Sequence, residues 1–263
     1  MPHLALGRLQ RPVITASLEK LERELPDDAL VLDVGGYIRP WSRADWVIDI
    51  MPYDGRGPHG RDGSGPERFS ADTWVQRDIC APEPWPFEDD QFDFVTCSQT
   101  LEDIRDPVGV CAELNRVAKA GYVEVPSRWV EHSWGIQGPW VGWAHHHWFC
   151  DVKPGGIEFV FKHHVVHARR SNYFPDEFHL SLSEEDRVQQ LWWEGSFRYE
   201  ERPILDIYGL DQYLAEFVRD NYPEHGAAIG DRVLTRAGTA MRELGMKLES
   251  RGRRQARERS GRR

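Results

Sequence analysis

The stretch that decides the fold is ALVLDVGG, residues 29–36. Its apolar run, residues 29–34, is closed by Gly35 and Gly36, a pattern that predicts a buried parallel strand entering a sharp turn. Glycine lets the backbone turn tightly beside a ligand, and a following helix would direct N–H groups at it. Asp33 suits a cationic ligand group. The stretch lacks the full G-x-G-x-x-G pattern, so a phosphate site loses support and a purely structural turn is the alternative.

Segments with strand and helix patterns alternate after this turn. Apolar strands are expected over residues 46–50, 92–98 and 122–126, and amphipathic helices over 12–25 and 106–119, with Gly121 as the C-cap of the second. We therefore predict an α/β fold, a Rossmann-like, doubly wound and mostly parallel sheet in three α/β/α layers. Residues 147–152 and 157–163 flank a Lys-Pro-Gly-Gly turn and predict a β-hairpin at an antiparallel edge of that sheet.

Composition excludes several classes of protein. The chain has 263 residues and a net charge of -10, and no apolar run approaches the roughly 20 residues that span a bilayer. Residues 251–263 hold seven arginines and one glutamate, so this tail carries +6 and residues 1–250 carry -16. An acidic body argues against nucleic acid, and the basic tail is expected to be disordered. The N-terminus lacks a signal sequence, and four cysteines without a CxxC pair favour a reducing cytoplasm.

A second acidic residue sits at the end of the next predicted strand. Asp49 lies sixteen residues after Asp33, within WVIDI. In doubly wound sheets an acid at this place accepts hydrogen bonds from ribose hydroxyls. A strand-terminal cap without a ligand is the alternative reading.

Six segments in order extend the pattern to a family. They are VLDVGG, VIDI, RDI, WPFEDDQFDFVTCS, LEDIRDP and ELNRVAKAGYVEVP. This order and spacing resembles the class I S-adenosylmethionine-dependent methyltransferases, and most closely the subgroup called methyltransferase type 11. The resemblance covers residues 29–126. Two positions depart from it, because Tyr37 replaces a further glycine and Asp103 replaces a frequent histidine.

The resemblance implies S-adenosyl-L-methionine as cofactor and assigns its methionine end. Asp33 would lie near the ammonium group, and Gly35 and Gly36 would let the backbone approach the cofactor. Ser98, at the end of the FDFVTCS strand, would line the methionine end.

The resemblance also assigns the nucleoside end. Asp49 would take the ribose hydroxyls and Ile50 would pack on the adenine. Asp78 would accept the adenine amino group, and the Ile79 backbone N–H would donate to the ring.

The second half of the chain is rich in histidine, at residues 145–147 and 163–167. Neighbouring strand residues point to opposite faces, and acidic or cysteine ligands at zinc-like spacing are lacking, so no metal site is expected. His145 or His146 is the candidate catalytic base, because histidine titrates near neutral pH and this segment follows the strand where the family builds its acceptor pocket. Hydrogen bonding within the hairpin and loop is the alternative.

Five tryptophans gather in the same region, within twenty residues. They form either an aromatic pocket or a core plug, and they are Trp129, Trp134, Trp140, Trp143 and Trp148.

We expect one domain over residues 1–250, with a cofactor core at 29–126, an acceptor side at 127–250 and the tail at 251–263. The expected function is methyl transfer to an O or N of a small-molecule or saccharide acceptor. A non-catalytic binding or scaffold protein is the alternative, and a nicotinamide oxidoreductase is disfavoured by the broken glycine pattern.

Overall fold

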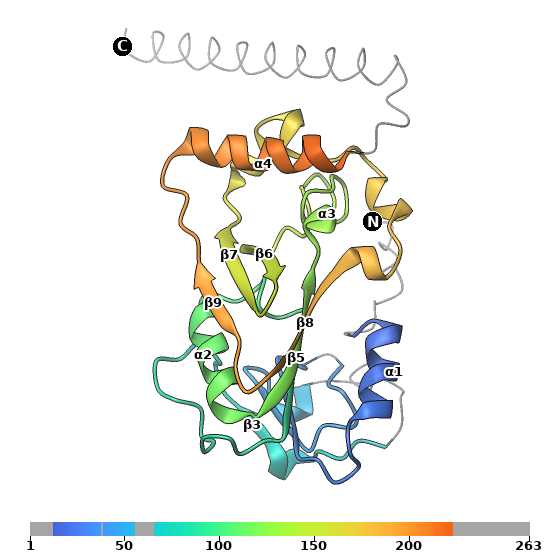
Figure 1. Cartoon of the computed structure of the whole chain (residues 1–263), viewed down its shortest axis with the longest axis vertical. Helices are drawn as coiled ribbons and strands as arrows, with labels where there is room; N and C mark the ends of the chain where they lie inside the picture. The colour runs from blue at the N-terminus through green and yellow to red at the C-terminus, as the bar shows by residue number, and fades with distance from the viewer. Residues whose placement is uncertain (1–12, 38, 56–65, 223–263) are drawn as a thin grey trace, which may run out of the picture.

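A computed structural model describes residues 13–37, 39–55 and 66–222 (Figure 1). Its main sheet has six strands in the order β3-β2-β1-β4-β5-β8, all parallel except β8, which runs antiparallel to β5. The strands are β1 (Val31–Val34), β2 (Trp46–Asp49), β3 (Trp74–Gln76), β4 (Phe94–Ser98), β5 (Ala120–Pro126) and β8 (Val188–Glu194). The predicted α/β class with a mostly parallel sheet is confirmed.

Helices cover both faces of this sheet, as Figure 1 shows. Successive strand residues point to opposite faces. Val31 and Val47 therefore pack with α1 (Thr15–Glu24) through Leu21. Leu32 and its neighbours pack on the other face with α2 (Pro107–Val117), whose apolar stripe is fully buried. The three-layer arrangement follows from this alternation.

The helix expected after the glycine turn is not formed. Residues 35–45, apart from position 38, contain no helix. Pro40 lacks an N–H, and the N–H of Trp41 is taken by the Asp33 carboxylate at 2.7 Å, so this segment is held as a loop.

Gly121 was expected as the C-cap of α2, and this is wrong. It lies inside β5, and the helix ends instead at Ala118, whose backbone is extended. A Cβ at Gly121 would come within 2.7 Å of the Trp193 indole on the neighbouring strand β8. The glycine is therefore explained by strand packing, which no helix-end pattern reveals.

The predicted hairpin forms, but it is not an edge of the main sheet. β6 (Trp148–Lys153) and β7 (Gly156–Phe161) pair antiparallel, and β9 (Arg198–Glu201) adds to β7 to complete a separate three-stranded sheet. The antiparallel edge of the main sheet is β8. The Gln189 side chain of β8 joins the two sheets, since it accepts from Val152 N–H at 3.0 Å and donates to the Cys150 carbonyl at 2.6 Å.

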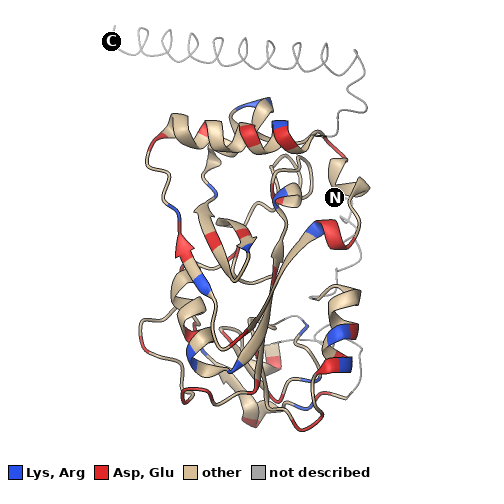
Figure 2. Ribbon diagram, viewed as in Figure 1, with Lys and Arg blue, Asp and Glu red and all other residues tan. Residues whose placement is uncertain are grey.

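The remaining elements cover the second sheet. α3 (Arg128–Glu131) follows β5, and α4 (Ile207–Asn221) packs its buried stripe of Leu210, Leu214 and Val218 against short 3-10 turns. Those turns are η3 (His164–His167) and η4 (Arg170–Asn172). Further 3-10 turns are η5 (Phe178–Ser181), η6 (Glu185–Arg187) and, before β3, η2 (Ala71–Thr73). The helix predicted over 228–250 and the basic tail lie outside the described residues. Within the part described, acidic and basic residues are interspersed along α1 (Figure 2).

Candidate functional site

The carboxyl ends of four parallel strands meet at one edge of the main sheet. β1 lies between β2 and β4, so the chain crosses from one side of β1 to the other at this point. In open α/β sheets, ligands bind where the strand order reverses in this way. Gly35, Asp49 and Ser98 stand at or just after the ends of β1, β2 and β4, and Asp78 follows β3. The fold thus gathers the predicted cofactor residues at a single edge.

Gly35 and Gly36 are required by close packing in the turn. Gly35 has a φ of 75°, in the left-handed region that favours glycine, and a Cβ there would overlap the Thr100 side chain. A Cβ on Gly36 would lie 2.6 Å from an Asp33 carboxylate oxygen and 2.9 Å from Pro40. The turn at Gly35 therefore lies against the segment that follows β4, and Gly36 packs against Asp33 and Pro40.

Asp33 acts first on the chain itself. It is 6% exposed, and its oxygens accept the Trp41 N–H at 2.7 Å and the Thr96 hydroxyl at 2.9 Å. The carboxylate thereby ties β1 to β4 and to the loop after the turn. Its predicted place near a ligand ammonium stays a prediction.

Asp49 lies at the end of β2 with both oxygens in use. Oδ2 accepts the Tyr37 N–H at 3.1 Å, and Oδ1 accepts the Met51 N–H at 2.7 Å. Burial raises the pKa of Asp49, and these two hydrogen bonds only partly offset the effect. Each carboxylate oxygen can accept a second bond, so ribose hydroxyls remain compatible with this geometry. The adjoining Ile50 is 59% exposed, which leaves an apolar surface beside the carboxylate.

Asp78 and Ile79 are adjacent in the sequence but lie in different environments. Asp78 forms an ion pair of 2.7 Å with Arg105 and accepts the Cys80 N–H. Burial alone would raise its pKa, but the Arg105 bond, the Cys80 N–H bond and the charges of Arg105 and Arg77 together outweigh burial, so the pKa is lowered. Ile79 is buried in the core, where its carbonyl accepts the Trp85 indole N–H at 3.0 Å.

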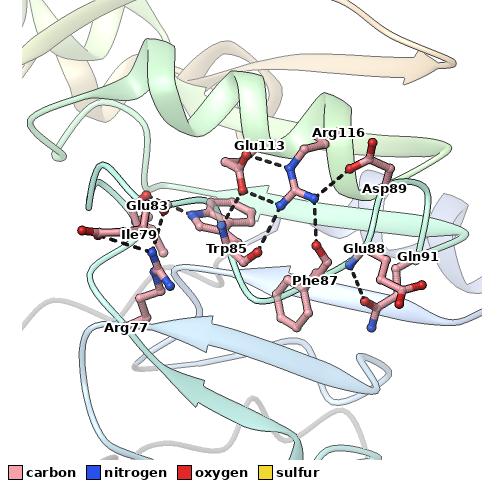
Figure 3. A network of polar contacts seen from close by, with 10 residues as sticks. All are labelled: Arg77, Ile79, Glu83, Trp85, Phe87, Glu88, Asp89, Gln91, Glu113 and Arg116. Atoms are coloured by element: carbon pink, nitrogen blue, oxygen red, sulfur yellow. Dashed lines mark hydrogen bonds and ion pairs between the residues drawn. The ribbon is translucent and has the colours of Figure 1, made fainter.

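An arginine network holds the loop between β3 and β4 against α2 (Figure 3). The guanidinium of Arg116 bonds both oxygens of Glu113, at 2.8 and 2.7 Å. It also donates to the carbonyls of Phe87 and Trp85 and to Asp89. Glu113 in turn accepts the Trp85 N–H at 2.7 Å. The ELNRV segment, which the sequence pattern singles out without a role, therefore anchors the loop that carries Asp78.

Ser98 lies at the end of β4 beside a buried glutamate that the sequence reading missed. Glu124 of β5 accepts from Gln99 at 3.1 Å, from Ser98 at 3.4 Å and from Tyr122 at 2.5 Å. It also accepts the Ile14 N–H. Burial raises the pKa of Glu124, and the hydrogen bonds oppose the rise without cancelling it. Glu124 thus fixes the segment after β4 from below.

The two candidate bases have different surroundings. His146 is buried, with Nδ1 at 2.7 Å from Glu131 Oε1 and Nε2 at 3.8 Å from Glu102 Oε1. Burial lowers its pKa, but the bond to Glu131 and the charges of Glu131 and Glu102 outweigh this, so the pKa is raised. His146 is therefore predominantly cationic below its raised pKa and is enclosed by carboxylates.

His145 is exposed on the same segment. Its Nδ1 lies 3.2 Å from the Gln137 side-chain oxygen. Partial burial and the neighbouring His146 cation lower its pKa. An exposed imidazole that stays neutral near pH 7 has the properties that a proton acceptor requires. The structure thus distinguishes two histidines that are adjacent in the sequence.

Three further histidines have structural bonds. His163 accepts the Val165 N–H and caps η3, and His167 accepts the Val141 N–H at 3.2 Å. His132 is fully buried, 2.9 Å from the Asn172 carbonyl. Among the described residues, no group of three or more His, Cys, Asp or Glu side chains is placed to hold a metal ion.

The five clustered tryptophans do not form one pocket. Trp148 is buried and its indole N–H donates to the Ile104 carbonyl at 2.8 Å, as a core plug does. Trp134 stacks on Tyr173, and Trp140, 47% exposed, contacts His167. Trp143 lies beside the candidate bases, and its ring centroid is 5.9 Å from that of His145 and 6.0 Å from that of His146.

The sheet order and the glycine turn at the strand crossover define a Rossmann-like domain, a fold that binds nucleoside-type ligands at the carboxyl edge of its sheet. Residues 63–123 match a family model described as a methyltransferase domain. This part of the chain, with its six ordered motifs, is therefore similar to S-adenosylmethionine-dependent methyltransferases.

Solved structures show partial likeness. One is the complex between the Haloferax volcanii Trm112 methyltransferase activator and a putative methyltransferase (18% identity, TM-score 0.32, 42% of this chain and 51% of that chain). A putative methyltransferase from Bacillus halodurans C-125 is 22% identical (TM-score 0.32, 43% and 52%). An S-adenosylmethionine dependent methyltransferase from Mesorhizobium loti is 14% identical (TM-score 0.33, 57% and 66%).

The chain spans about half the length of the first two of these structures. No curated protein matches it. No helix in the described part of the chain is long and apolar enough to cross a membrane.

Proposed function

We propose that this protein transfers a methyl group from S-adenosylmethionine to an oxygen or nitrogen of a small-molecule or saccharide acceptor. The observation that carries the proposal is the gathering of Gly35, Asp49 and Ser98 at the strand crossover. S-adenosylmethionine, when bound, supplies a methyl group on a positively charged sulfur. The protein's contribution is then mostly to hold the acceptor in line with that methyl group.

The residues present at this edge fit such a cofactor. The Gly35–Gly36 turn lies at the end of β1 beside Asp49, and the carboxylate of Asp49 has free lone pairs for ribose hydroxyls. The exposed side chain of Ile50 supports a role beneath the adenine. Asp78, on the loop anchored by Arg116, is assigned to the adenine amino group. Ser98 and Asp33 are assigned to the methionine end.

We assign the acceptor-side base to His145 in preference to His146. His145 is exposed and its pKa is lowered, so at neutral pH it can take a proton from an acceptor hydroxyl or amine. His146 is enclosed between two carboxylates and its pKa is raised, which suits a fixed positive charge. The protein thus presents a neutral imidazole to the acceptor and keeps its neighbour charged.

The acceptor class is inferred from the same region. Trp143 lies beside both histidines and supports a flat or ring-shaped acceptor. The charge of -16 over residues 1–250 disfavours nucleic acid as the substrate. The four cysteines are free, in accord with a reducing cytoplasm. Residues 127–250 are assigned as the acceptor side of a single domain, and residues 251–263 as a tail.

A non-catalytic binding protein is the second candidate. It is favoured by the state of Asp49 and Asp33, whose oxygens already accept bonds from the chain itself. Calorimetry with S-adenosylmethionine and S-adenosylhomocysteine tests whether the protein binds the cofactor. If neither ligand binds at millimolar concentration, both the methyltransferase proposal and the cofactor assignment are wrong. Binding without labelled-methyl transfer across an acceptor panel would favour the second candidate.

A further inference from the structure

A buried network of four ionisable side chains lies beside the candidate base. It consists of Glu102, in the turn after β4, Glu131 of α3, His146, and Lys162 just after β7. Their side chains are between 1% and 7% exposed. Four ionisable groups so far from water must be paired, because an isolated buried charge is strongly unfavourable.

Three of the four are well paired. Glu131 accepts from His146 through Oε1 and from Lys162 through Oε2. Lys162 also donates to the Trp143 carbonyl at 2.9 Å. Although burial acts to raise it, the pKa of Glu131 is lowered by these two cationic partners. Glu131 therefore remains ionised within the network.

Glu102 is the exception. Both of its carboxyl oxygens are buried and lack a hydrogen-bond partner among the residues that the structure describes. The nearest cationic group is His146 Nε2, at 3.8 Å. Burial raises the pKa of Glu102 to about 7, with the His146 charge acting in the opposite direction. A carboxyl group in this state holds a proton that a neighbouring imidazole can also hold.

Charge balance limits the number of protons in the network. The charges of ionised Glu131 and of Lys162 cancel. The network is therefore neutral in two states: Glu102 ionised with His146 protonated, or Glu102 protonated with His146 neutral. Either state contains a single shared proton. Two groups that interact this closely titrate as a pair.

Three other titratable groups face Glu102, and none of them adds a second proton to the network. The thiols of Cys97 on β4 and Cys150 on β6 lie near it, and burial raises the pKa of both well above the ordinary value, so they stay neutral. Asp103, in the same turn, is exposed and acts to raise the pKa of Glu102.

The same turn also holds the base segment mechanically. The Glu102 carbonyl accepts the N–H groups of both His147 and Trp148, at 2.7 and 3.1 Å. The rings of His145 and His146 meet edge-on with centroids 4.5 Å apart. Backbone bonds therefore fix where the histidines lie, and the charge of His146 is felt directly by His145.

We propose that Glu102 is a positioning residue that shares one proton with His146 and, through the His146 charge, keeps His145 in its neutral, proton-accepting form. The role of His145 rests on the proposed function, whereas the proton sharing does not. Glu102 thereby tunes the protonation state of His145.

The test is an NMR titration of the full chain, following side-chain carboxyl carbons and histidine ring signals. In the wild type, we expect the Glu102 carboxyl to titrate near neutral pH, with a matching inflection at His146. In Glu102→Gln, the apparent pKa of His146 should fall, because a negative neighbour is lost. That of His145 should rise, because the cation beside it is lost. These opposite shifts would not arise from a purely structural role.

Asp103→Asn is the matched control, since it removes one negative charge from the same turn. Asp103 acts to raise the pKa of His145 directly. This variant should therefore lower the pKa of His145, the reverse of Glu102→Gln, while the pKa of His146 should not fall, because Glu102 keeps its negative charge.

The proposal is overturned if the wild-type Glu102 carboxyl titrates near the unperturbed glutamate value of about 4.3. It is also overturned if both histidines titrate unchanged in a folded Glu102→Gln variant. If that variant does not fold, the wild-type carboxyl titration decides alone. Failure of the proposed function would appear separately, as absent S-adenosylmethionine binding in calorimetry, and would leave these titrations unaffected.

Discussion

Gly35 packs against Thr100 so closely that a Cβ at position 35 would overlap the threonine side chain. This contact joins the turn after β1 to the turn after β4, on the two sides of the strand crossover. It explains why glycine is needed here and places the turn after β1 next to the LED segment.

Gly35→Ala should lower the free energy of unfolding by about 2–4 kcal/mol, from overpacking against Thr100 and from the left-handed backbone. Chemical denaturation measures this. Gly195→Ala is the control, because Gly195 has a similar φ of 72° with nothing within 4 Å of the added Cβ. Its loss should be about 1 kcal/mol, and equal losses in the two variants would contradict the packing argument. Adding Thr100→Ala to Gly35→Ala should restore part of the stability.

Asp49→Asn should weaken S-adenosylmethionine binding by roughly 10- to 100-fold, since a hydrogen bond to a charged group contributes about 1.5–3 kcal/mol. Isothermal calorimetry gives the dissociation constants. Asp72→Asn, at an exposed acid in η2, serves as the control and should leave affinity unchanged. Unchanged affinity in Asp49→Asn would remove Asp49 from the ribose role.

Arg116→Ala should destabilise the protein by about 2–3 kcal/mol, because it leaves Glu113 without its bidentate partner and frees the carbonyls of Trp85 and Phe87. Thermal unfolding reports the change. Arg219→Ala, which removes an exposed pair with Asp220, should have an effect within about 0.5 kcal/mol. Equal melting temperatures in the two variants would show that the network of Figure 3 contributes little.

The contribution of Glu102 to stability should fall as the pH rises from about 5 to about 8. The pKa of Glu102 is raised from 4.5 to about 7 in the folded chain, so the folded state binds more protons than the unfolded state in this interval. The lost stability is roughly 3 kcal/mol from this group. The raised pKa of His146 acts in the same direction. Denaturation at several pH values measures the slope, which Glu102→Gln should reduce. Equal slopes in the wild type and in Glu102→Gln would contradict the shift.

The rate of methyl transfer should rise with pH through a value below 6.5 and then level off, because His145 must be neutral to accept a proton and its pKa is lowered from 6.5. The pH dependence of kcat, with an acceptor found by labelled-methyl screening, measures this. His145→Gln should abolish the inflection and lower kcat by about 100-fold or more, with little change in cofactor affinity. A preserved inflection in that variant would exclude His145 as the base.

Short-range patterns determined much of the cofactor half. The apolar run before Gly35, the acid at Asp49 and the periodicity of α2 each depend on residues close in sequence, so strands, helix and turn could be predicted. The helix expected after the turn failed because Pro40 and the Asp33–Trp41 bond redirect the chain. A family pattern does not contain that local competition.

The acceptor side shows the opposite case. The sequence marked His145 and His146 as equivalent, whereas burial, Glu131 and Glu102 make one a charged bridge and the other a neutral exposed ring. Likewise, the hairpin was evident from its Pro-Gly-Gly turn, but its place in a second sheet depends on pairing with β9, some forty residues away.

The sequence alone therefore predicted a resemblance to methyltransferases, the order of the parallel strands' motifs and the acids at their ends. Only the tertiary structure decided which ionisable groups lose their water and which partners they meet. The physical reason is that secondary structure follows local periodicity, whereas the pKa of a side chain such as Glu102 follows from burial and from charges at positions 131, 146 and 162.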